Sequence, residues 1–486
     1  MATVAPLHDD SENAHRSRAA PIAAVTSPPV TAPAPDHIAA RALPRELGLL
    51  SATMIVVGGI IGGGIFFTPA QVARTLPTGG WVLAIWMIGG LIALAGALTF
   101  AELGAMLPDA GGPFVYIRRA FGEMAAFIYG WMILTTIASG AAAAVALAFA
   151  NYVGRFFDLA PVGGTTVVAV AVLLILTATN YRGLRLGAAV QNTLVMSKLV
   201  ALGALILGVI VLWNRIPAPA PIVSAEKLPP LVTGLAAAFI PVLFSVGGWE
   251  NLNMVAGEVR DPARLIPRAL ALGIAIIMIC YLGVNVAYLH VLGRDGMAAS
   301  SSVAADTAIR MIGSLGGTLI TIAAMVSMLG LVNVVLLATP RIFYAMSREG
   351  LFYSAASRIH PRFGTPHISI AMLGLWSVAL LLLARSRLDW LLNGEVFADW
   401  IFFGLSAASV FVFRRAMPMQ PRPYRAWGYP LVPLFFVAAS GVAVLSAVVS
   451  APIPSAFGAF SAVVGVIVYA VFSRRWSVAA RTSTDQ

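Results

Sequence analysis

Long apolar segments alternate with short polar connections over most of this chain, from about residue 49 to about residue 473. A helix needs about 20 mostly apolar residues to span a bilayer, and twelve segments approach or exceed that length. They are 49–76, 80–105, 122–153, 164–180, 189–213, 231–256, 269–292, 315–340, 367–384, 391–413, 429–450 and 456–473. The pattern predicts an all-α membrane protein with twelve transmembrane helices. It excludes an outer-membrane barrel, whose strands alternate polar and apolar positions over about ten residues.

Composition and charge support a membrane protein and orient it. Of the 486 residues, 59% are hydrophobic and 10% are charged, whereas soluble proteins have about 25% charged residues. A soluble enzyme is therefore excluded. Of the 31 Lys and Arg residues, 22 lie in the termini and in connections after even-numbered segments, eight lie in the opposite connections, and Lys198 lies within a segment. This bias predicts both termini in the cytoplasm, and it explains the net charge of +11 without a nucleic-acid partner.

The ends of the chain and its single cysteine carry less information. Residues 1–45 are rich in Ala, Pro and Ser, and we expect a disordered cytoplasmic tail there rather than a signal peptide. We expect residues 474–486 to form a C-terminal cytoplasmic tail. Cys280 lies in an apolar segment, and a single cysteine forms no internal disulfide.

Two segments carry glycines where an uninterrupted helix would avoid them. The first contains VVGGIIGGGIFFTP, and the sixth contains FSVGGWENLN. A glycine in a helix interior costs about 1 kcal/mol relative to alanine. The two segments run in opposite directions because they are five apart, and such a pair is typical of transporters built from inverted repeats. Tight helix packing is an alternative reason for Gly58 and Gly62, which are four residues apart.

A helix that is interrupted in mid-membrane leaves backbone groups that must face a cavity or a ligand. The N–H groups at the start of a half-helix suit a carboxylate, whereas free carbonyls suit an ammonium group. One site that offers both fits a zwitterion. The pattern therefore favours a transporter whose substrate is a zwitterion such as an amino acid.

Several ordered motifs resemble those of the amino acid–polyamine–organocation superfamily, and within it the L-type (LAT-like) amino acid transporters. They are GGIIGGGIFFTP, FAELGAMLPDAGGPFVYIRRAFGE, FSVGGWENLNMVAGEVRDPARLIPRA, RIFYAMSREGLF and RIHPRFGTP. The similarity runs from about Leu47 to Arg415. It implies a LeuT-like fold of five plus five inverted helices, with repeats at 46–213 and 231–415 and two accessory helices at 429–473.

The resemblance also implies where a substrate binds. The backbone at Gly63 and Gly64 would hold its carboxylate, and carbonyls near Ile60, Phe244 and Gly247 would hold its amino group. The implied substrate-binding residues are Ile60, Gly62, Gly63, Gly64, Phe244, Ser245 and Gly247, with Phe244 and Trp249 as gate residues. The family often has Ser at the position of Gly63, so a hydroxyl contact is missing here.

Lys198, one of two lysines, lies about 15 Å from the predicted cytoplasmic end of its helix, at about 1.5 Å of rise per residue. A charge at that depth costs on the order of 3 kcal/mol and indicates a functional residue; snorkelling to the surface is the alternative. In similar sodium-independent members a lysine here takes the place of a sodium ion and connects the fifth span with the first and eighth. The resemblance thus implies a coupling role, whether Lys198 stays charged or releases a proton.

Five further polar residues are candidates. Glu250 lies near the second interruption, is a possible pocket residue and suits gating or proton transfer, while Glu258 is expected to pair with nearby arginines. Asp399 falls where family members line the pocket, and an acid there would select a cationic side chain. Ser327 and Asn333 in the eighth span either hydrogen-bond to neighbouring helices or have a functional role, which for Ser327 would be in the pocket.

Some alternatives stay open at this point. Exchange and proton-coupled symport are both compatible with the sequence, and so is a polyamine or amine permease, although its substrate lacks a carboxylate for Gly63 and Gly64. Short loops disfavour a sensor or receptor. Without metal-ligand spacing or a Walker loop, no metal, cofactor or ATP use is expected.

The expected partners are an amino acid substrate and membrane lipids, with no nucleic acid. Eukaryotic L-type transporters carry a cysteine after the third span that bonds a glycoprotein, and RFFDLAPVGG has none. No disulfide-linked subunit is therefore expected, and we predict a stand-alone permease of the bacterial inner membrane. The preferred side chain and the oligomeric state stay open.

Overall fold

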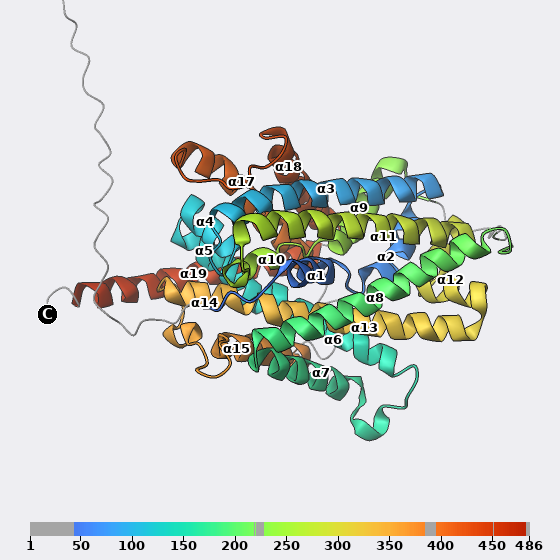
Figure 1. Cartoon of the computed structure of the whole chain (residues 1–486), viewed down its shortest axis with the longest axis horizontal. Coiled ribbons are helices and arrows are strands. Elements are labelled where there is room, and N and C mark those ends of the chain that lie inside the picture. The colour runs from blue at the N-terminus through green and yellow to red at the C-terminus, as the bar shows by residue number, and fades with distance from the viewer. Residues whose placement is uncertain (1–42, 218, 220–227, 384–394, 451, 483–486) are drawn as a thin grey trace, which may run out of the picture. The chain divides into compact units, whose positions relative to one another are not determined.

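The computed structural model describes residues 43–217, 219, 228–383, 395–450 and 452–482, and Figure 1 shows its helices. Within these residues the regular structure is helical, apart from one isolated parallel bridge between Leu47 and Val259. Eleven helices are long and apolar enough to cross a membrane, and a further apolar helix, His367–Leu383, has 17 residues. The predicted all-α membrane fold is confirmed, but the number of twelve spans is not.

The first five spans begin with the interrupted one. They consist of α1 (Leu49–Ile60) with α2 (Gly64–Thr75), α3 (Gly79–Met106), α5 (Glu123–Met132) with the π-helical η1 (Ile133–Ile137) and α6 (Ala138–Val153), α7 (Gly164–Tyr181), and α8 (Leu184–Leu212). The short α4 (Pro113–Phe121) connects the second span to the third, and η2 (Ala160–Val162) precedes α7.

The next five spans repeat this order. They consist of α9 (Leu231–Val246) with α10 (Asn251–Met254), α11 (Pro262–Ala299), α13 (Ser314–Ala338) with α14 (Pro340–Arg348), α15 (His367–Leu383), and α17 (Glu395–Ala416). The connections contain η3 (Ala256–Glu258), α12 (Val303–Ile312) and η4 (Ser354–Ser357), and α18 (Leu431–Ser450) and α19 (Pro452–Thr482) follow.

The two predicted tails compare differently with the structure. The N-terminal tail predicted at 1–45 lies outside the described residues, except for its last three positions. The part of the predicted C-terminal tail up to Thr482 is helical and continues α19, and its last four residues lie outside the described residues.

Helices at corresponding places of the two predicted repeats pack against each other (Figure 1). α1 contacts α10 and α2 contacts α9, while α3 packs on α11, α6 on α13 and α7 on α15. In the interrupted pair, the first half of each span therefore contacts the second half of the other. Two inverted repeats related by a pseudo-two-fold axis in the membrane plane produce this pairing.

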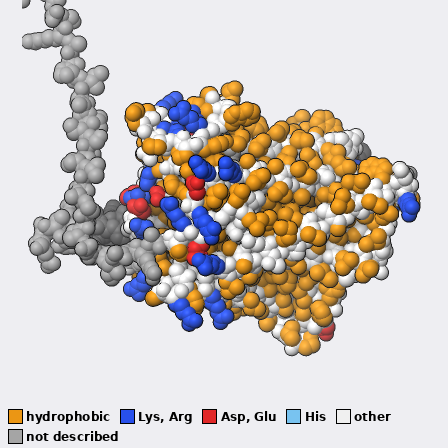
Figure 2. Space-filling view, in the orientation of Figure 1, with side chains coloured by type: hydrophobic (Ala, Val, Ile, Leu, Met, Phe, Trp, Pro, Cys, Tyr) orange, Lys and Arg blue, Asp and Glu red, His pale blue; other side chains and the backbone are white. Residues whose placement is uncertain are grey.

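Charged side chains gather toward one end of the face shown in Figure 2, the end at which α4 and α14 lie in Figure 1. Much of the remaining face is covered by apolar side chains. This distribution suits a bilayer that surrounds the apolar part of the bundle and leaves the charged end in water.

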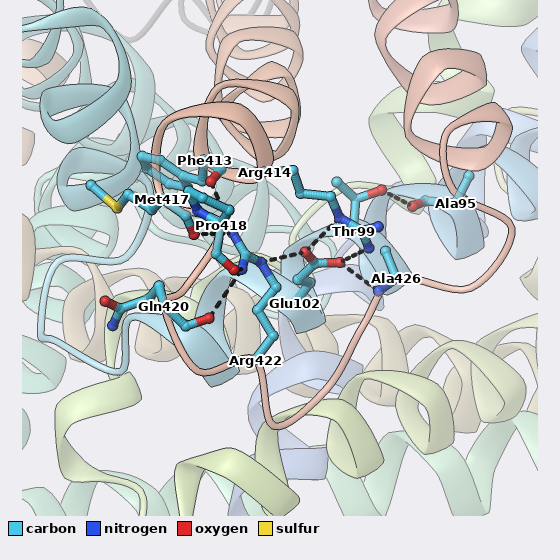
Figure 3. A network of polar contacts seen from close by, with 10 residues as sticks. All are labelled: Ala95, Thr99, Glu102, Phe413, Arg414, Met417, Pro418, Gln420, Arg422 and Ala426. Carbon is cyan, nitrogen blue, oxygen red and sulfur yellow. Dashed lines mark hydrogen bonds and ion pairs between the residues drawn. The ribbon is translucent and has the colours of Figure 1, made fainter. Parts of the chain in front are cut away.

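A buried carboxylate, that of Glu102 on α3, is the centre of a polar network (Figure 3). Its Oε1 accepts a hydrogen bond from Arg414 Nε at 3.0 Å, and its Oε2 accepts bonds from Arg414 Nη2 and the backbone N–H of Ala426, both at 2.6 Å. Arg422 Nε lies 3.5 Å from Oε1. A carboxylate that is 2% exposed needs such partners. The network connects α3 to the end of α17 and to the connection toward α18.

Candidate functional site

The two interrupted helices meet backbone against backbone. α1 ends at Ile60 and α9 ends at Val246, so both predicted interruptions are present. A Cβ atom added to Gly59 would lie 2.2 Å from the carbonyl oxygen of Gly248, and one added to Gly248 would lie 2.2 Å from the carbonyl oxygen of Gly59. Gly248 also has a positive φ of 103°, which favours glycine. No other residue type allows this contact.

The interruptions leave backbone groups without intramolecular partners. The N–H groups of Gly63 and Gly64 donate to no acceptor among the described residues. At the second interruption, the carbonyls of Phe244 and Gly247 accept no hydrogen bond from any of the residues that the structure describes. Gly63 and Gly64 are buried while Phe244 and Gly247 are partly buried, and buried backbone groups without a partner are rare in proteins. These donors and acceptors therefore mark a place for a small polar ligand.

Two cavities lie on either side of this place. The inner cavity, about 100 Å³ in volume, is lined by residues of both interruptions and by residues of the third, eighth and tenth spans. The outer cavity, about 380 Å³, lies between α2 and α6. Four residues line both cavities, namely Gly64, Val145, Phe244 and Leu331. The side chain of Phe244 thus lies at the boundary, where a gate would have to be.

Lys198 on α8 is fully buried and reaches the end of α1. Its Nζ donates to the carbonyl of Ile61 and, at 3.3 Å, to the carbonyl of Gly58. The Oγ of Ser327 on α13 lies 2.8 Å from the carbonyl oxygen of Gly62 and 3.2 Å from that of Ile61, so its single proton is shared between these two acceptors. These contacts join the fifth, first and eighth spans around carbonyls that the interruption has freed. The ammonium group of Lys198 thus lies among backbone carbonyl oxygens, which are ligands that a metal ion can also use.

Tyr281 on α11 was not singled out in the sequence, yet it connects the two interruptions. Its hydroxyl lies 3.1 Å from the carbonyl of Ile60 and 3.1 Å from that of Ser245. The hydroxyl of Ser245, predicted to bind substrate, lies 2.9 Å from that of Thr68 and donates to Pro241. A tyrosine within an apolar segment is indistinguishable from a core residue by pattern, so no sequence signal identified Tyr281.

Glu250 and Asp399 both line the inner cavity. The Oε2 atom of Glu250 accepts the N–H of Gly248 at 3.0 Å, and its Oε1 atom accepts from Asn251 Nδ2 at 3.4 Å. This carboxylate thereby stabilises the interrupted backbone next to α10, a role that the sequence did not suggest.

Trp249 packs in an aromatic cluster rather than in the wall of either described cavity. Its ring centroid lies 4.7 Å from that of Phe100 and 5.7 Å from that of Phe436. Of the two aromatic residues expected as gates, only Phe244 is in contact with the cavities.

Asn333 belongs to a buried amide chain between helices, as one of its two expected roles required. It donates to Gln191 Oε1 at 2.9 Å and accepts from Asn180 Nδ2 at 2.9 Å, joining α13 to α8 and α7. Glu258, expected to pair with nearby arginines, forms a bidentate ion pair with Arg341, at 2.6 Å and 3.1 Å, and both side chains are at most 1% exposed. Within the described ranges, no group of His, Cys, Asp or Glu has the geometry to hold a metal ion.

Comparison with known proteins shows which proteins the chain is similar to. The family model described as "Amino acid permease" matches residues 47–472. The serine/threonine exchanger SteT of Bacillus subtilis is 31% identical over 407 residues, which are 83% of this chain and 91% of that protein. The human large neutral amino acids transporter small subunit 2 is 33% identical over 81% of this chain and 75% of its own length. The human b(0,+)-type amino acid transporter 1 is 31% identical over 84% of both chains.

Proposed function

The chain belongs to the amino acid permease family of membrane transporters, and from this membership we propose that it exchanges L-amino acids by sodium-independent alternating access. The observation that carries the proposal is the contact of two interrupted helices at Gly59 and Gly248, beside unpartnered backbone donors and acceptors. An ordinary helix bundle has no need of such a contact. Transporters with a binding site in mid-membrane typically form it from a pair of interrupted helices.

A zwitterion matches the free backbone groups. In the proposal, the N–H groups of Gly63 and Gly64 bind the substrate carboxylate at the positive end of the α2 dipole. The carbonyls of Phe244 and Gly247 accept the substrate ammonium group at the end of α9. The carbonyl of Ile60 contributes less, because it already accepts from Tyr281 and from the N–H of Gly62.

Lys198 supports sodium independence. When protonated, its ammonium group supplies a positive charge at the carbonyls of Gly58 and Ile61. Oxygen ligands of this kind would otherwise need a cation to compensate them. A sodium ion at the same place would meet a positive charge, so we infer that transport proceeds without it.

The packing supports a division into two moving parts. In one group α1, α2 and α3 all pack on α11 and α9 packs on α2 and α3, while α6, α7, α13 and α15 form a second group. We propose that rocking of the first group against the second opens the outer and the inner cavity in turn, with Phe244 closing the boundary. The inverted repeats are assigned to 46–213 and 231–415, and the accessory helices to 429–473.

The charge distribution supports an orientation. In the proposal the charged end in Figure 2 faces the cytoplasm of a bacterial cell, with both termini on that side, and the outer cavity faces the exterior. The relatives' names include a serine/threonine exchanger and a large neutral amino acids transporter. The inner cavity of about 100 Å³, apolar on much of its wall, supports uncharged side chains as the main substrates.

One observation favours a second candidate. Glu250 and Asp399 place two carboxyl groups in the inner cavity, and these would suit a cationic side chain or an amine. An amine permease would leave the N–H groups of Gly63 and Gly64 without an anion, so we rank it second. Competition of L-alanine against agmatine separates the two candidates.

The test is uptake of radiolabelled L-serine and L-leucine into proteoliposomes that contain the purified protein. We expect uptake that internal amino acid strongly stimulates, and no effect of replacing sodium by choline. Uptake driven by an inward proton gradient without internal substrate would instead indicate symport. A requirement for sodium would refute the role assigned to Lys198.

A further inference from the structure

The outer cavity lies between one face of α2 and one face of α6. One side of its wall comes from the start of α2 and the residue before it, and the other side from α6, with Arg155 just after α6. The lining positions are 63, 64, 67 and 71 on the first side and 144, 145, 148, 151 and 152 on the second. Within each helix these positions are mostly three or four residues apart, so they share a face. The cavity is therefore a groove that follows both helices, rather than a gap between loops.

The lining changes from apolar to polar along this groove. At the boundary with the inner cavity, Phe244, Val145 and Leu331 form an apolar floor. At the other end, Gln71 and Asn151 are exposed and present amide groups. Seven residues separate Val145 from Tyr152, a rise of about 10 Å along the helix. A small amino acid at the polar end therefore does not reach the N–H groups at the first interruption.

Arg155 is the charged residue of the described cavity wall. Its guanidinium carbon lies 4.6 Å from the centroid of the Tyr152 ring, which holds the side chain by a cation–π contact. No ion pair links Arg155 to a carboxylate in the described parts of the chain. On the same side of the molecule, Arg74 is engaged with the carbonyls of Ala298 and Ser300. The positive charge of Arg155 is therefore available to a ligand in the groove.

We propose that the polar end of the outer cavity is a first docking site for the carboxylate of an incoming amino acid, formed by Arg155, Asn151 and Gln71. A guanidinium group and two side-chain amides supply the planar donors that a carboxylate prefers. The substrate binds there, leaves Arg155, and passes to Gly63 and Gly64 when Phe244 moves. This inference rests on the proposed function and adds a selection step to it. Neutral and acidic amino acids enter more readily than substrates with a net positive charge.

A purely structural role for Arg155 makes a different prediction. The residue follows α6, and a cation near a helix C-terminus interacts favourably with the helix dipole. In that case its removal would change the thermal stability of the protein and leave substrate affinity alone. Measurements of KM from each face of the membrane therefore distinguish a docking role of Arg155 from a purely structural one.

The experiment compares Arg155→Gln and Arg155→Lys with the control Arg215→Gln, which removes an exposed charge from outside the described cavity walls. Radiolabelled L-serine uptake is measured in intact bacterial cells, which present the outer cavity, and in inverted vesicles, which present the inner cavity. We expect R155Q to raise the KM for L-serine uptake by cells about fivefold, as for the loss of an exposed ion pair. The maximal rate in cells and the KM in inverted vesicles should stay unchanged. R155K should lie between R155Q and the wild type.

The outcomes separate the two proposals. If wild-type protein transports L-serine but R155Q and R215Q have the same KM in cells, the docking site is refuted while the transporter stands. An equal rise of KM in cells and vesicles would refute the docking site too, because a site in the outer cavity acts only on substrate that arrives from that face. If the wild type transports neither L-serine nor L-leucine, the proposed function itself fails. Thermal unfolding of each purified variant shows that the proteins compared are folded.

Discussion

Lys198 and Ser327, on α8 and α13, donate to one and the same carbonyl, that of Ile61 at the end of α1. The two donors approach from helices that do not belong to the interrupted span. The last carbonyls of a helix have no partner of their own, so these side chains replace the missing turn. The first interruption is therefore fixed in place by a charge and a hydroxyl group.

Replacing Lys198 by Ala tests whether this charge is needed for transport. The carbonyls of Gly58 and Ile61 would lose a donor, and a buried group left unpaired costs about 1–3 kcal/mol. We expect the rate of L-serine exchange in proteoliposomes to fall by about tenfold or more, since 1.4 kcal/mol corresponds to tenfold.

Ser327→Ala is the matched comparison, because it removes a neutral donor to Ile61 and leaves the charge. Its loss should be smaller than that of K198A. If K198A exchanged at the wild-type rate, Lys198 would be a buried structural residue without a coupling role. If added sodium restored the exchange rate of K198A, this would support the proposal that the ammonium group takes the place of a sodium ion.

The interruptions could be predicted from the sequence, because glycine runs within apolar segments are visible without any tertiary information. The depth of Lys198 also follows from counting residues along a helix. By contrast, the contacts of Tyr281 depend on how α11 crosses α1 and α9, which periodicity does not encode. The aromatic cluster around Trp249 escaped for the same reason, since its neighbour Phe436 lies far away in sequence.

For some residues that the sequence did identify, packing in the folded protein defines the structural role. Glu250 was a candidate for gating, yet its carboxylate accepts the backbone N–H of Gly248 and so supports the interruption itself. Asn333, for which helix-to-helix hydrogen bonds and a functional role were both open, forms hydrogen bonds with Asn180 and Gln191 between helices. Sequence pattern places a polar residue at a certain depth, but only packing decides what it faces.

The contact of Gly59 with Gly248 predicts intolerance to the smallest side chain. In Gly59→Ala the new Cβ would overlap the carbonyl of Gly248, and the clash involves backbone that cannot swing away. We expect a loss of about 1–3 kcal/mol in stability, as for overpacked cores, and loss of exchange. Thermal unfolding in detergent and proteoliposome exchange measure the two effects.

Gly441→Ala is the control for this change, because nothing lies within 4 Å of a Cβ atom at Gly441 on α18. Alanine there should be neutral or slightly stabilising, since it favours a helix by about 1 kcal/mol over glycine. An equal response of the two variants would mean that the backbones at Gly59 and Gly248 can separate without harm.

The ion pair between Glu258 and Arg341 should contribute far more to stability than a surface pair. Both side chains are buried, so Arg341→Ala would leave the Glu258 charge without its partner. We expect a destabilisation of about 3–5 kcal/mol. Arg264→Ala is the matched control, because the Arg264 to Asp261 pair is exposed at 3.9 Å, and exposed pairs contribute about 0–1 kcal/mol. Chemical unfolding of the two variants measures the difference, and similar values would contradict the burial argument.

Asp399→Asn tests how the inner cavity distinguishes charged substrates. The side chain lines the inner cavity together with Glu250, so its negative charge should favour a cationic substrate there. Removing it should raise the concentration of agmatine or L-lysine needed to inhibit L-leucine exchange. The expected factor is about tenfold, because close opposite charges inside a protein contribute about 1.4 kcal/mol or more. The KM for L-leucine, whose side chain carries no charge, should change little. An equal change for leucine and lysine would show that Asp399 shapes the cavity without selecting charge, and it would remove the observation that favours an amine permease.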